Sequence, residues 1–188
     1  MKFYLRDAII TLGLALFFFL IFNTSLQASV VQDVSMQPTL IAGQRIIIVK
    51  IYYYFSDPKR GDIIIVHPPI DLEREFVKRL VGLPGDTIEI KEHQVYVNNV
   101  PLNEPYLKNQ PAYTYGPFTV PENNYFLLGD NRNNSTDSHF NWTVTRDEIV
   151  GKACWRIWPP DKWGSPGNYP LDDQLDDHTS SSTILSTR

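Results

Sequence analysis

Phe76-Val77-Lys78-Arg79-Leu80-Val81-Gly82-Leu83 predicts a β-strand that carries a lysine between large apolar residues. Alternate side chains of a strand share a face, so Phe76, Lys78 and Leu80 are expected to point one way and Arg79 the other. Burial disfavours the ammonium, so such a lysine can be neutral and accept a proton, which a guanidinium cannot. A strand lysine is also typical of a side chain that reaches a sheet edge or pairs with a nearby carboxylate. The strand alone leaves both interpretations open.

Other short apolar or alternating runs surround this strand, and Gly, Pro and Asn separate them. They cover Gln44–Tyr54, Ile63–Val66, Thr87–Lys91, Gln94–Val97, Val100–Leu102, Tyr125–Leu128 and Ile149–Trp158. Turn signals such as Pro84-Gly85-Asp86 and Asn98-Asn99 stand between them. Helical periodicity is scarce in this part of the chain. The pattern predicts a mainly β fold, with a compact antiparallel, barrel-like domain over residues 29–164.

The amino terminus differs, because Ala8 to Phe22 contains no charged residue and Thr11 is its only polar side chain. A spanning helix needs about 17 to 25 predominantly apolar residues, so we expect a transmembrane anchor over residues 8–28. Lys2 and Arg6 precede it, which predicts a cytoplasmic segment 1–7 and places the following β domain on the opposite side of the membrane. A cleavable secretory signal fits the same residues, and cleavage would release a soluble protein.

Composition limits the remaining possibilities. The 188 residues, 43% of them hydrophobic, suffice for one compact domain with appendages. A net charge of -4 without a basic run argues against a nucleic-acid partner. A single cysteine, Cys154, excludes an internal disulfide, and the four scattered histidines do not suggest a metal site. Acidic pairs and a serine run predict that residues 165–188 form a disordered tail.

Four motifs follow one another along the chain. They are Ser35-Met36-Gln37-Pro38-Thr39-Leu40, Arg60-Gly61-Asp62, Lys78-Arg79-Leu80-Val81-Gly82-Leu83-Pro84-Gly85-Asp86 and Gly129-Asp130-Asn131-Arg132-Asn133-Asn134-Ser135-Thr136-Asp137-Ser138. Together they resemble the sequence boxes of bacterial type I signal peptidases, over a stretch from the apolar segment to about residue 154.

The resemblance implies a membrane-anchored serine endopeptidase that removes signal peptides and needs no cofactor. Its partners would be membrane lipid and preproteins with small residues at the first and third positions before the cleaved bond. The enzyme would lie in the bacterial cell membrane or an internal bacterial membrane.

The resemblance also implies roles for individual residues. A serine hydroxyl is a weak nucleophile until a base takes its proton, and the family's roles fall on Ser35 as nucleophile and Lys78 as general base. Further polar residues that it places around this pair are Ser135, Asp137, Asp130 and Arg132. Ser135 is expected to hydrogen-bond the amine of Lys78, and the others to hold the site together.

Asp33 departs from the family pattern, in which many members have Ser or Gly two residues before the nucleophile. A carboxylate there would oppose a developing oxyanion, so we expect Asp33 to point away. The backbone N–H of Ser35 then remains as one donor, and the second donor is not identified.

Three alternatives stay open at this point. His139, close to Asp137 in the sequence, could serve as the base of a Ser/His/Asp triad. A self-cleaving Ser/Lys protease of the stress-response repressor type shares the chemistry but would need a DNA-binding region in place of the apolar span. A non-enzymatic secreted β-domain would make Ser35 and Lys78 incidental.

Overall fold

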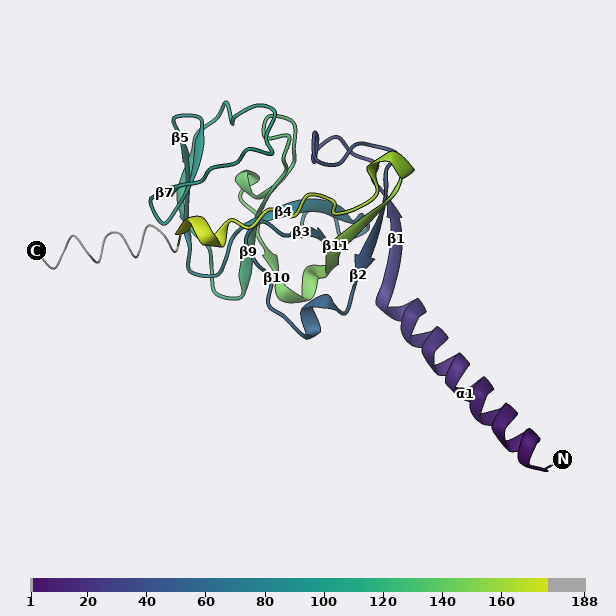
Figure 1. The fold of residues 1–188 in the computed structure, drawn as a ribbon. Helices are drawn as coiled ribbons and strands as arrows, with labels where there is room; N and C mark the ends of the chain where they lie inside the picture. The colour runs from purple at the N-terminus through teal and green to yellow at the C-terminus, as the bar shows by residue number, and fades with distance from the viewer. Residues whose placement is uncertain (1, 176–188) are drawn as a thin grey trace, which may run out of the picture.

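The computed structural model describes residues 2–175, which form one long helix followed by a β domain (Figure 1). The helix is α1 (Lys2–Ser25), and the strands are β1 (Leu26–Val30), β2 (Arg45–Val49), β3 (Ile63–Val66), β4 (Phe76–Gly82), β5 (Thr87–Lys91), β6 (Gln94–Val97), β7 (Val100–Pro101), β8 (Tyr115–Thr119), β9 (Asn124–Leu128), β10 (Val144–Thr145) and β11 (Ile149–Trp158). Short 3-10 helices lie at η1 (Tyr52–Tyr54), η2 (Ser138–Phe140), η3 (Arg146–Glu148) and η4 (Pro160–Lys162).

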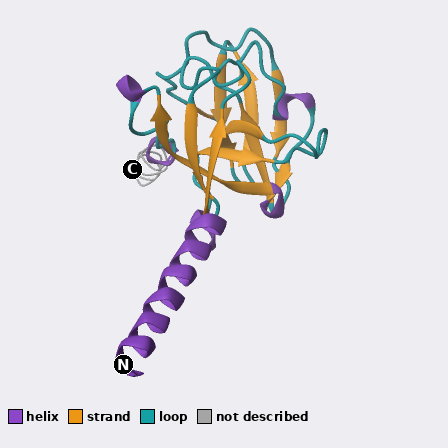
Figure 2. Ribbon diagram, turned by 90° about the vertical axis from the view of Figure 1, so that its right-hand side faces the viewer, coloured by secondary structure: helices purple, strands orange, loops and turns teal. Residues whose placement is uncertain are grey.

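The strands form two antiparallel sheets. The larger sheet has seven strands in the order β1-β2-β11-β3-β4-β9-β10, and the smaller has four in the order β7-β6-β5-β8. Figure 2 shows the strands gathered in one domain, from which the long helix projects. The predicted mainly β, antiparallel fold is therefore confirmed.

Strand β3 explains why a fully apolar run suits this sheet. All four of its residues are buried, and adjacent side chains enter different apolar clusters. Ile63 and Ile65 pack in one cluster with Met36 and Leu40, whereas Ile64 packs in another with residues of β4 and β9. A third cluster joins the two sheets, because it contains residues of β4 and β9 together with residues of β5 and β6. The strand that carries Lys78 therefore lies in the interior of the domain.

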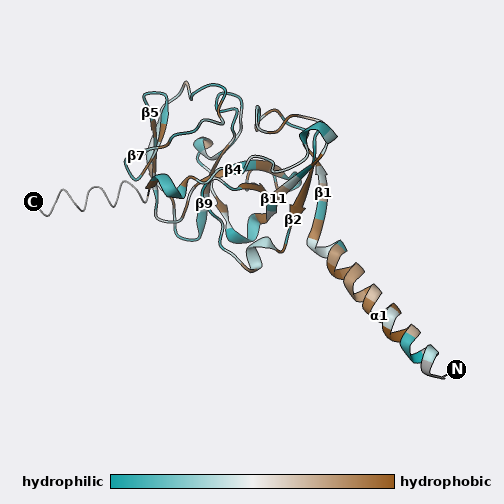
Figure 3. Ribbon diagram, in the orientation of Figure 1, coloured by the Kyte–Doolittle hydropathy of each residue, from teal (hydrophilic) through white to brown (hydrophobic). Residues whose placement is uncertain are grey.

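Helix α1 projects away from the β domain, and its apolar residues are exposed (Figure 3). Residues Arg6–Ser25 are long and apolar enough to cross a membrane. The predicted anchor boundary at residue 28 is too late, because α1 ends at Ser25 and Leu26 begins β1. The reason is tertiary: β1 pairs along its whole length with β2, and the N–H of Lys50 donates to the carbonyl of Ser25 at 2.8 Å.

The predicted tail needs a correction at its beginning. The segment 165–175 packs on the domain, since Leu171 is fully buried in the cluster between the sheets. The Asn168 side chain accepts from the N–H of Ile63 at 2.7 Å and donates to the carbonyl of Ala153 at 3.0 Å. The boundary at Ser165 is therefore wrong, and the rest of the predicted tail, residues 176–188, lies outside the described residues.

Candidate active site

Ser35 lies in a turn after β1, and the turn is held by its own apolar side chains. Met36 and Leu40 are buried in a core cluster, and the N–H of Leu40 donates to the carbonyl of Met36 at 2.9 Å. Ser35 itself is 4% exposed. The motif therefore places a nearly buried hydroxyl on a fixed turn.

Lys78 lies on β4 and is 1% exposed. Its amine lies 5.3 Å from the centroid of the Phe76 ring, as expected for alternate residues of a strand. Burial lowers the pKa of Lys78, and the carboxylates of Asp137, Asp33 and Asp130 counteract this only in part. Among residues 2–175, none forms a hydrogen bond or an ion pair with this amine. The surroundings thus favour a neutral amine with a free lone pair.

Ser35 and Lys78 line the same groove, which has a volume of about 570 Å³. One wall is the end of β1 and the turn that follows, and the other is the start of β4 with the residues before it. Its lining consists of Ser29, Val30, Val31, Gln32, Asp33, Ser35, Met36, Ile65, Glu73, Arg74, Glu75, Phe76, Val77 and Lys78. The Ser35 hydroxyl and the Lys78 amine therefore line one groove, without a hydrogen bond between them in this structure.

The loop after β9 packs directly against the Ser35 turn. The backbone N–H of Asn131 donates to the carbonyl of Ser35 at 2.9 Å, and its side chain donates to the carbonyl of Val34 at 3.2 Å. Gly129 is required here, because a Cβ at that position would lie 2.6 Å from the Ser35 carbonyl oxygen and 2.2 Å from Ser135 Oγ. The first and last sequence motifs are therefore in contact.

Ser135 is buried beside this contact, and its hydroxyl has no hydrogen-bond partner among the described residues. The bond that was expected between Ser135 and the amine of Lys78 is thus not formed in this structure. Within residues 2–175, the Ser135 hydroxyl and the Lys78 amine are thus two polar groups near the Ser35 turn that form no hydrogen bond.

Asp137 is fully buried and holds the loop after β9 in shape. Its carboxylate accepts from the N–H of Gly129 at 2.9 Å and from Nδ1 of His139 at 2.5 Å. The His139 ring stacks on Tyr113, with ring centroids 4.3 Å apart. His139 lines a different pocket from the one that Ser35 and Lys78 share.

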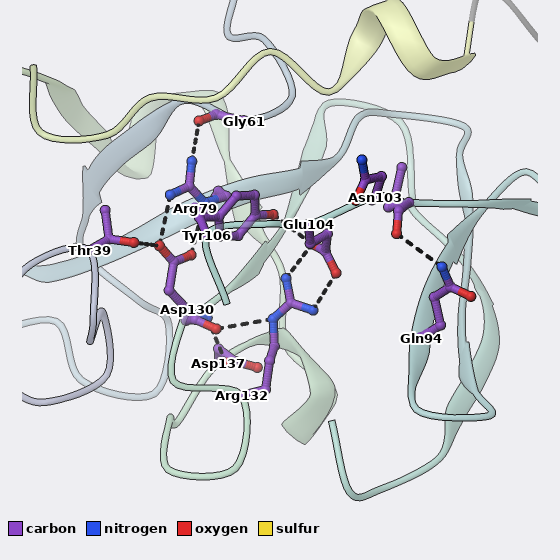
Figure 4. A network of polar contacts seen from close by, with 12 residues as sticks. Thr39, Gly61, Arg79, Gln94, Asn103, Glu104, Tyr106, Asp130, Arg132 and Asp137 are labelled. Atoms are coloured by element: carbon purple, nitrogen blue, oxygen red, sulfur yellow. Dashed lines mark hydrogen bonds and ion pairs between the residues drawn. The ribbon is translucent and has the colours of Figure 1, made fainter. Parts of the chain in front are cut away.

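Arg79 follows Lys78 in β4, so its side chain belongs to the other face of the strand. It pairs with Asp130 (Figure 4). Two parallel hydrogen bonds of 2.8 and 2.7 Å join the guanidinium to the carboxylate, and both side chains are fully buried. The Thr39 hydroxyl also donates to Asp130, and Arg79 donates to the carbonyl of Gly61 at 2.8 Å. This pair connects β4 to the Ser35 turn and to the loop after β9.

Arg132 forms a second buried pair, with Glu104. Arg132 donates to one Glu104 oxygen at 2.8 Å, and the hydroxyl of Tyr106 donates to the other at 2.6 Å. The Tyr106 ring also lies under the guanidinium of Arg79, 3.9 Å from its central carbon. The sequence offered no signal for Glu104 or Tyr106, because they lie in a loop outside the four motifs.

Asp33 lies at the edge of the groove and is exposed. Its carboxylate accepts from the N–H of Val34 at 2.6 Å, within its own turn. The N–H of Ser35 donates to no other group among residues 2–175. That donor is therefore free for a negative oxygen that develops beside Ser35.

The Arg60-Gly61-Asp62 motif supports the domain rather than the groove. Arg60 pairs with Asp86 at 2.6 Å, and Asp62 pairs with Lys152 at 2.6 Å. In the described part of the chain, no group of three His, Cys, Asp or Glu side chains could hold a metal ion.

Comparisons with known proteins agree with the motifs. The sequence profile of the family described as "Signal peptidase, peptidase S26" matches residues 4–158. A "Signal peptidase I" of Leptolyngbya laminosa is 41% identical over 174 residues, which are 88% of this chain and 86% of that protein. "Probable signal peptidase I-2" of Synechocystis is 43% identical over 143 residues, covering 73% of this chain and 66% of that protein.

Two further relatives are more distant. "Thylakoidal processing peptidase 1, chloroplastic" of Arabidopsis thaliana is 38% identical over 143 residues, which are 70% of this chain and 42% of that protein. The crystal structure of a signal peptidase I from Enterococcus faecalis is 35% identical with a TM-score of 0.47, and the similarity covers 52% of this chain and 97% of that chain.

Proposed function

Because this chain belongs to the signal peptidase family, peptidase S26, and is a serine endopeptidase that removes signal peptides from preproteins, we propose that Ser35 is its nucleophile and Lys78 its general base. The observation that carries this assignment is the buried, unpartnered Lys78 amine in the groove that Ser35 also lines. The lowered pKa of Lys78 supports the role, since only the neutral amine can accept a proton.

The reaction follows from these two groups. The Lys78 amine takes the proton of Ser35 while Ser35 Oγ bonds to the carbonyl carbon of the scissile peptide. The carbon–nitrogen bond then breaks, and the Lys78 ammonium returns its proton to the leaving amine. Water then gives a proton to the same amine and attacks the acyl carbon, the bond from that carbon to Ser35 Oγ breaks, and the Lys78 ammonium returns its proton to Ser35. The Ser35 N–H stabilises the oxyanion in both halves of the reaction.

The loop after β9 would position this pair. Asp137 fixes the backbone at Gly129, which contacts the Ser35 turn, and so keeps the nucleophile in place. The partnerless hydroxyl of Ser135 would turn toward the Lys78 amine and orient its lone pair. The buried pairs Arg79–Asp130 and Arg132–Glu104 would hold the surrounding backbone rigid without taking part in proton transfer.

We also propose the finer features of substrate and location. Small side chains at the first and third positions before the cleaved bond would suit the shallow apolar walls near Met36 and Val77, with the peptide extended along the groove. Helix α1 would anchor the enzyme in the bacterial cell membrane or an internal membrane, with residues 1–7 in the cytoplasm.

Catalysis by histidine is a weaker candidate. His139 binds Asp137 as a triad histidine would, but it lines the pocket on the other side of Asp33 rather than the groove of Ser35. Nothing in the described residues gives His139 a contact with Ser35.

The test is cleavage of a purified preprotein by the full-length enzyme in detergent, with Ser35→Ala and Lys78→Met compared with the wild type. We expect each variant to lose at least about a thousandfold in kcat/KM, because the two groups act as one unit. The matched controls Ser56→Ala and Lys108→Met, at positions outside the groove, should retain activity. Retained activity in Lys78→Met together with its loss in His139→Ala would refute the base assignment.

A further inference from the structure

The rim of the groove that Ser35 lines carries several acidic side chains. Three exposed carboxylates line it, those of Asp33, Glu73 and Glu75. Among residues 2–175, none of the three lies within ion-pair distance of a cationic side chain. The groove therefore presents negative charge that the protein itself does not neutralise.

The one cation at the rim is already engaged. Arg74 pairs with Asp71 at 2.5 Å, and Asp71 is not part of the lining. Glu75 accepts two hydrogen bonds from the neutral amide of Gln27, at 3.2 and 3.0 Å, which fix its position without cancelling its charge. Inside the groove Lys78 is 1% exposed, and its amine forms no ion pair with any of the three rim carboxylates.

The contact between Gln27 and Glu75 also indicates which end of the groove lies nearest to α1. Gln27 follows closely on the end of α1 at Ser25, so this acidic end is the end nearest the membrane. A signal peptide carries its apolar segment before the cleavage site, and that segment lies in the membrane. The residues before the cleaved bond therefore enter past Glu75 and reach Ser35 at the far end.

The strand spacing gives the position of contact. An extended chain advances about 3.3 Å per residue, so Glu75, which directly precedes β4 and stands three residues before Lys78, lies roughly 10 Å from it. A substrate in the same conformation covers that distance with about three residues. Allowing for side-chain reach, the substrate residues that pass the two glutamates are about the fourth to the sixth before the bond.

We propose that Glu73 and Glu75 are specificity-determining residues that favour preproteins with a lysine or arginine about four to six residues before the cleaved bond and disfavour those with a carboxylate there. This inference rests on the proposed function, because it takes Ser35 and Lys78 as the fixed end of the groove. The glutamates touch the substrate away from the reacting atoms and act through its charge.

The test measures kcat/KM for two forms of one preprotein, with Lys or Glu at the fifth residue before the bond, and repeats the comparison at the fourth and sixth. For the full-length wild type at low salt we expect the Lys form to be cleaved about three- to tenfold better at one of these positions, since exposed charge pairs are individually weak. The ratio should approach one near 0.5 M salt, where screening is strong. The double variant Glu73→Gln/Glu75→Gln should bring the ratio close to one at low salt.

The ratio compares kcat/KM for the Lys form and the Glu form on the same enzyme. A substitution that lowers activity on both forms equally therefore leaves the ratio unchanged. The matched control Glu122→Gln/Asp161→Asn removes two exposed carboxylates outside the groove and should keep the wild-type ratio. A ratio that survives in the double variant or at high salt, or a wild-type ratio of one or below at all three positions, would overturn the inference. A preprotein with the uncharged residue Gln at the tested position separates the two proposals. If the Ser35→Ala enzyme cleaved this preprotein, the Ser35/Lys78 assignment would be refuted, whatever the ratio for the Lys and Glu forms is.

Discussion

Lys78 has an amine that the fold removes from water without giving it a partner among residues 2–175. Burial lowers its pKa in the folded protein, whereas in the unfolded chain the pKa is near the ordinary 10.4 or so. Between these two values the unfolded state binds more protons, so the free energy of unfolding rises with pH across that window. Below the folded-state pKa of Lys78, the buried ammonium lowers the free energy of unfolding. The residue that serves as the proposed base therefore destabilises the fold at those pH values.

Replacing Lys78 with methionine, which has a similar length and no charge, should therefore stabilise an inactive protein. We expect Lys78→Met to raise the free energy of unfolding at pH 7 by on the order of 1 kcal/mol, as is common when a functional residue is removed. Thermal unfolding in detergent at pH 7 and near pH 10.5 checks this, and the gain should be smaller at the higher pH. The exposed Lys108→Met serves as control, and a lower melting temperature for Lys78→Met would contradict this reasoning.

The sequence predicted part of this residue-level arrangement. Strand alternation predicted that Phe76 and Lys78 share a face, and their contact confirms it. Sequence could not identify the acid that accompanies Arg132, because Glu104 lies 28 residues away and is brought to it only by the packing of a loop. From the sequence alone, any of the 21 acidic residues could have been the partner of Arg132.

At the scale of the elements, strands with strong apolar runs and turn residues at their ends were predictable, as for β3, β4, β5 and β6. Three strands were missed for identifiable reasons. β1 continues an apolar segment and becomes a strand only by pairing with β2. β8 contains Gly116-Pro117, which is typical of a turn, and β10 has two residues. Each of β1, β8 and β10 is a strand because it pairs with a strand that lies elsewhere in the sequence.

The segment 165–175 shows the same limit, because its polar composition hides one deeply buried residue. Leu171→Ala should lower the free energy of unfolding by about 2 to 5 kcal/mol, since it removes buried methyl groups from the cluster between the sheets. Denaturant unfolding in detergent measures this. The control Leu72→Ala, at a residue that is 66% exposed, should change stability by less than about 0.5 kcal/mol. Equal, small effects of both substitutions would show that the segment does not pack as described.

At the scale of the whole molecule, one apolar helix leads into a β domain (Figure 1). The groove lining includes Ser29 in β1, the strand that follows directly after α1. If α1 crosses the membrane, the β domain from Leu26 to Trp158 lies on one side of it. A preprotein held in the same membrane would then meet the groove without leaving the lipid surface.

The proposed orientation can be tested by labelling intact cells with a membrane-impermeant thiol reagent, in a Cys154→Ser background. A cysteine at the exposed position Lys162 should react without permeabilisation, because we place the β domain outside the cytoplasm. A cysteine at Tyr4, which is 82% exposed at the other end of α1, should react only after permeabilisation. The reverse pattern would invert the topology.

The most direct test of the Ser/Lys assignment is the pH dependence of kcat/KM for an uncharged preprotein, measured for the wild type and for His139→Gln. A buried lysine as base predicts that activity rises with pH through a single pKa below the ordinary 10.4 or so, then levels off, and that His139→Gln leaves this rise in place. Activity that keeps rising to about pH 10.5, as for an ordinary lysine, or a rise that disappears in His139→Gln, would contradict the assignment of Lys78 as the base.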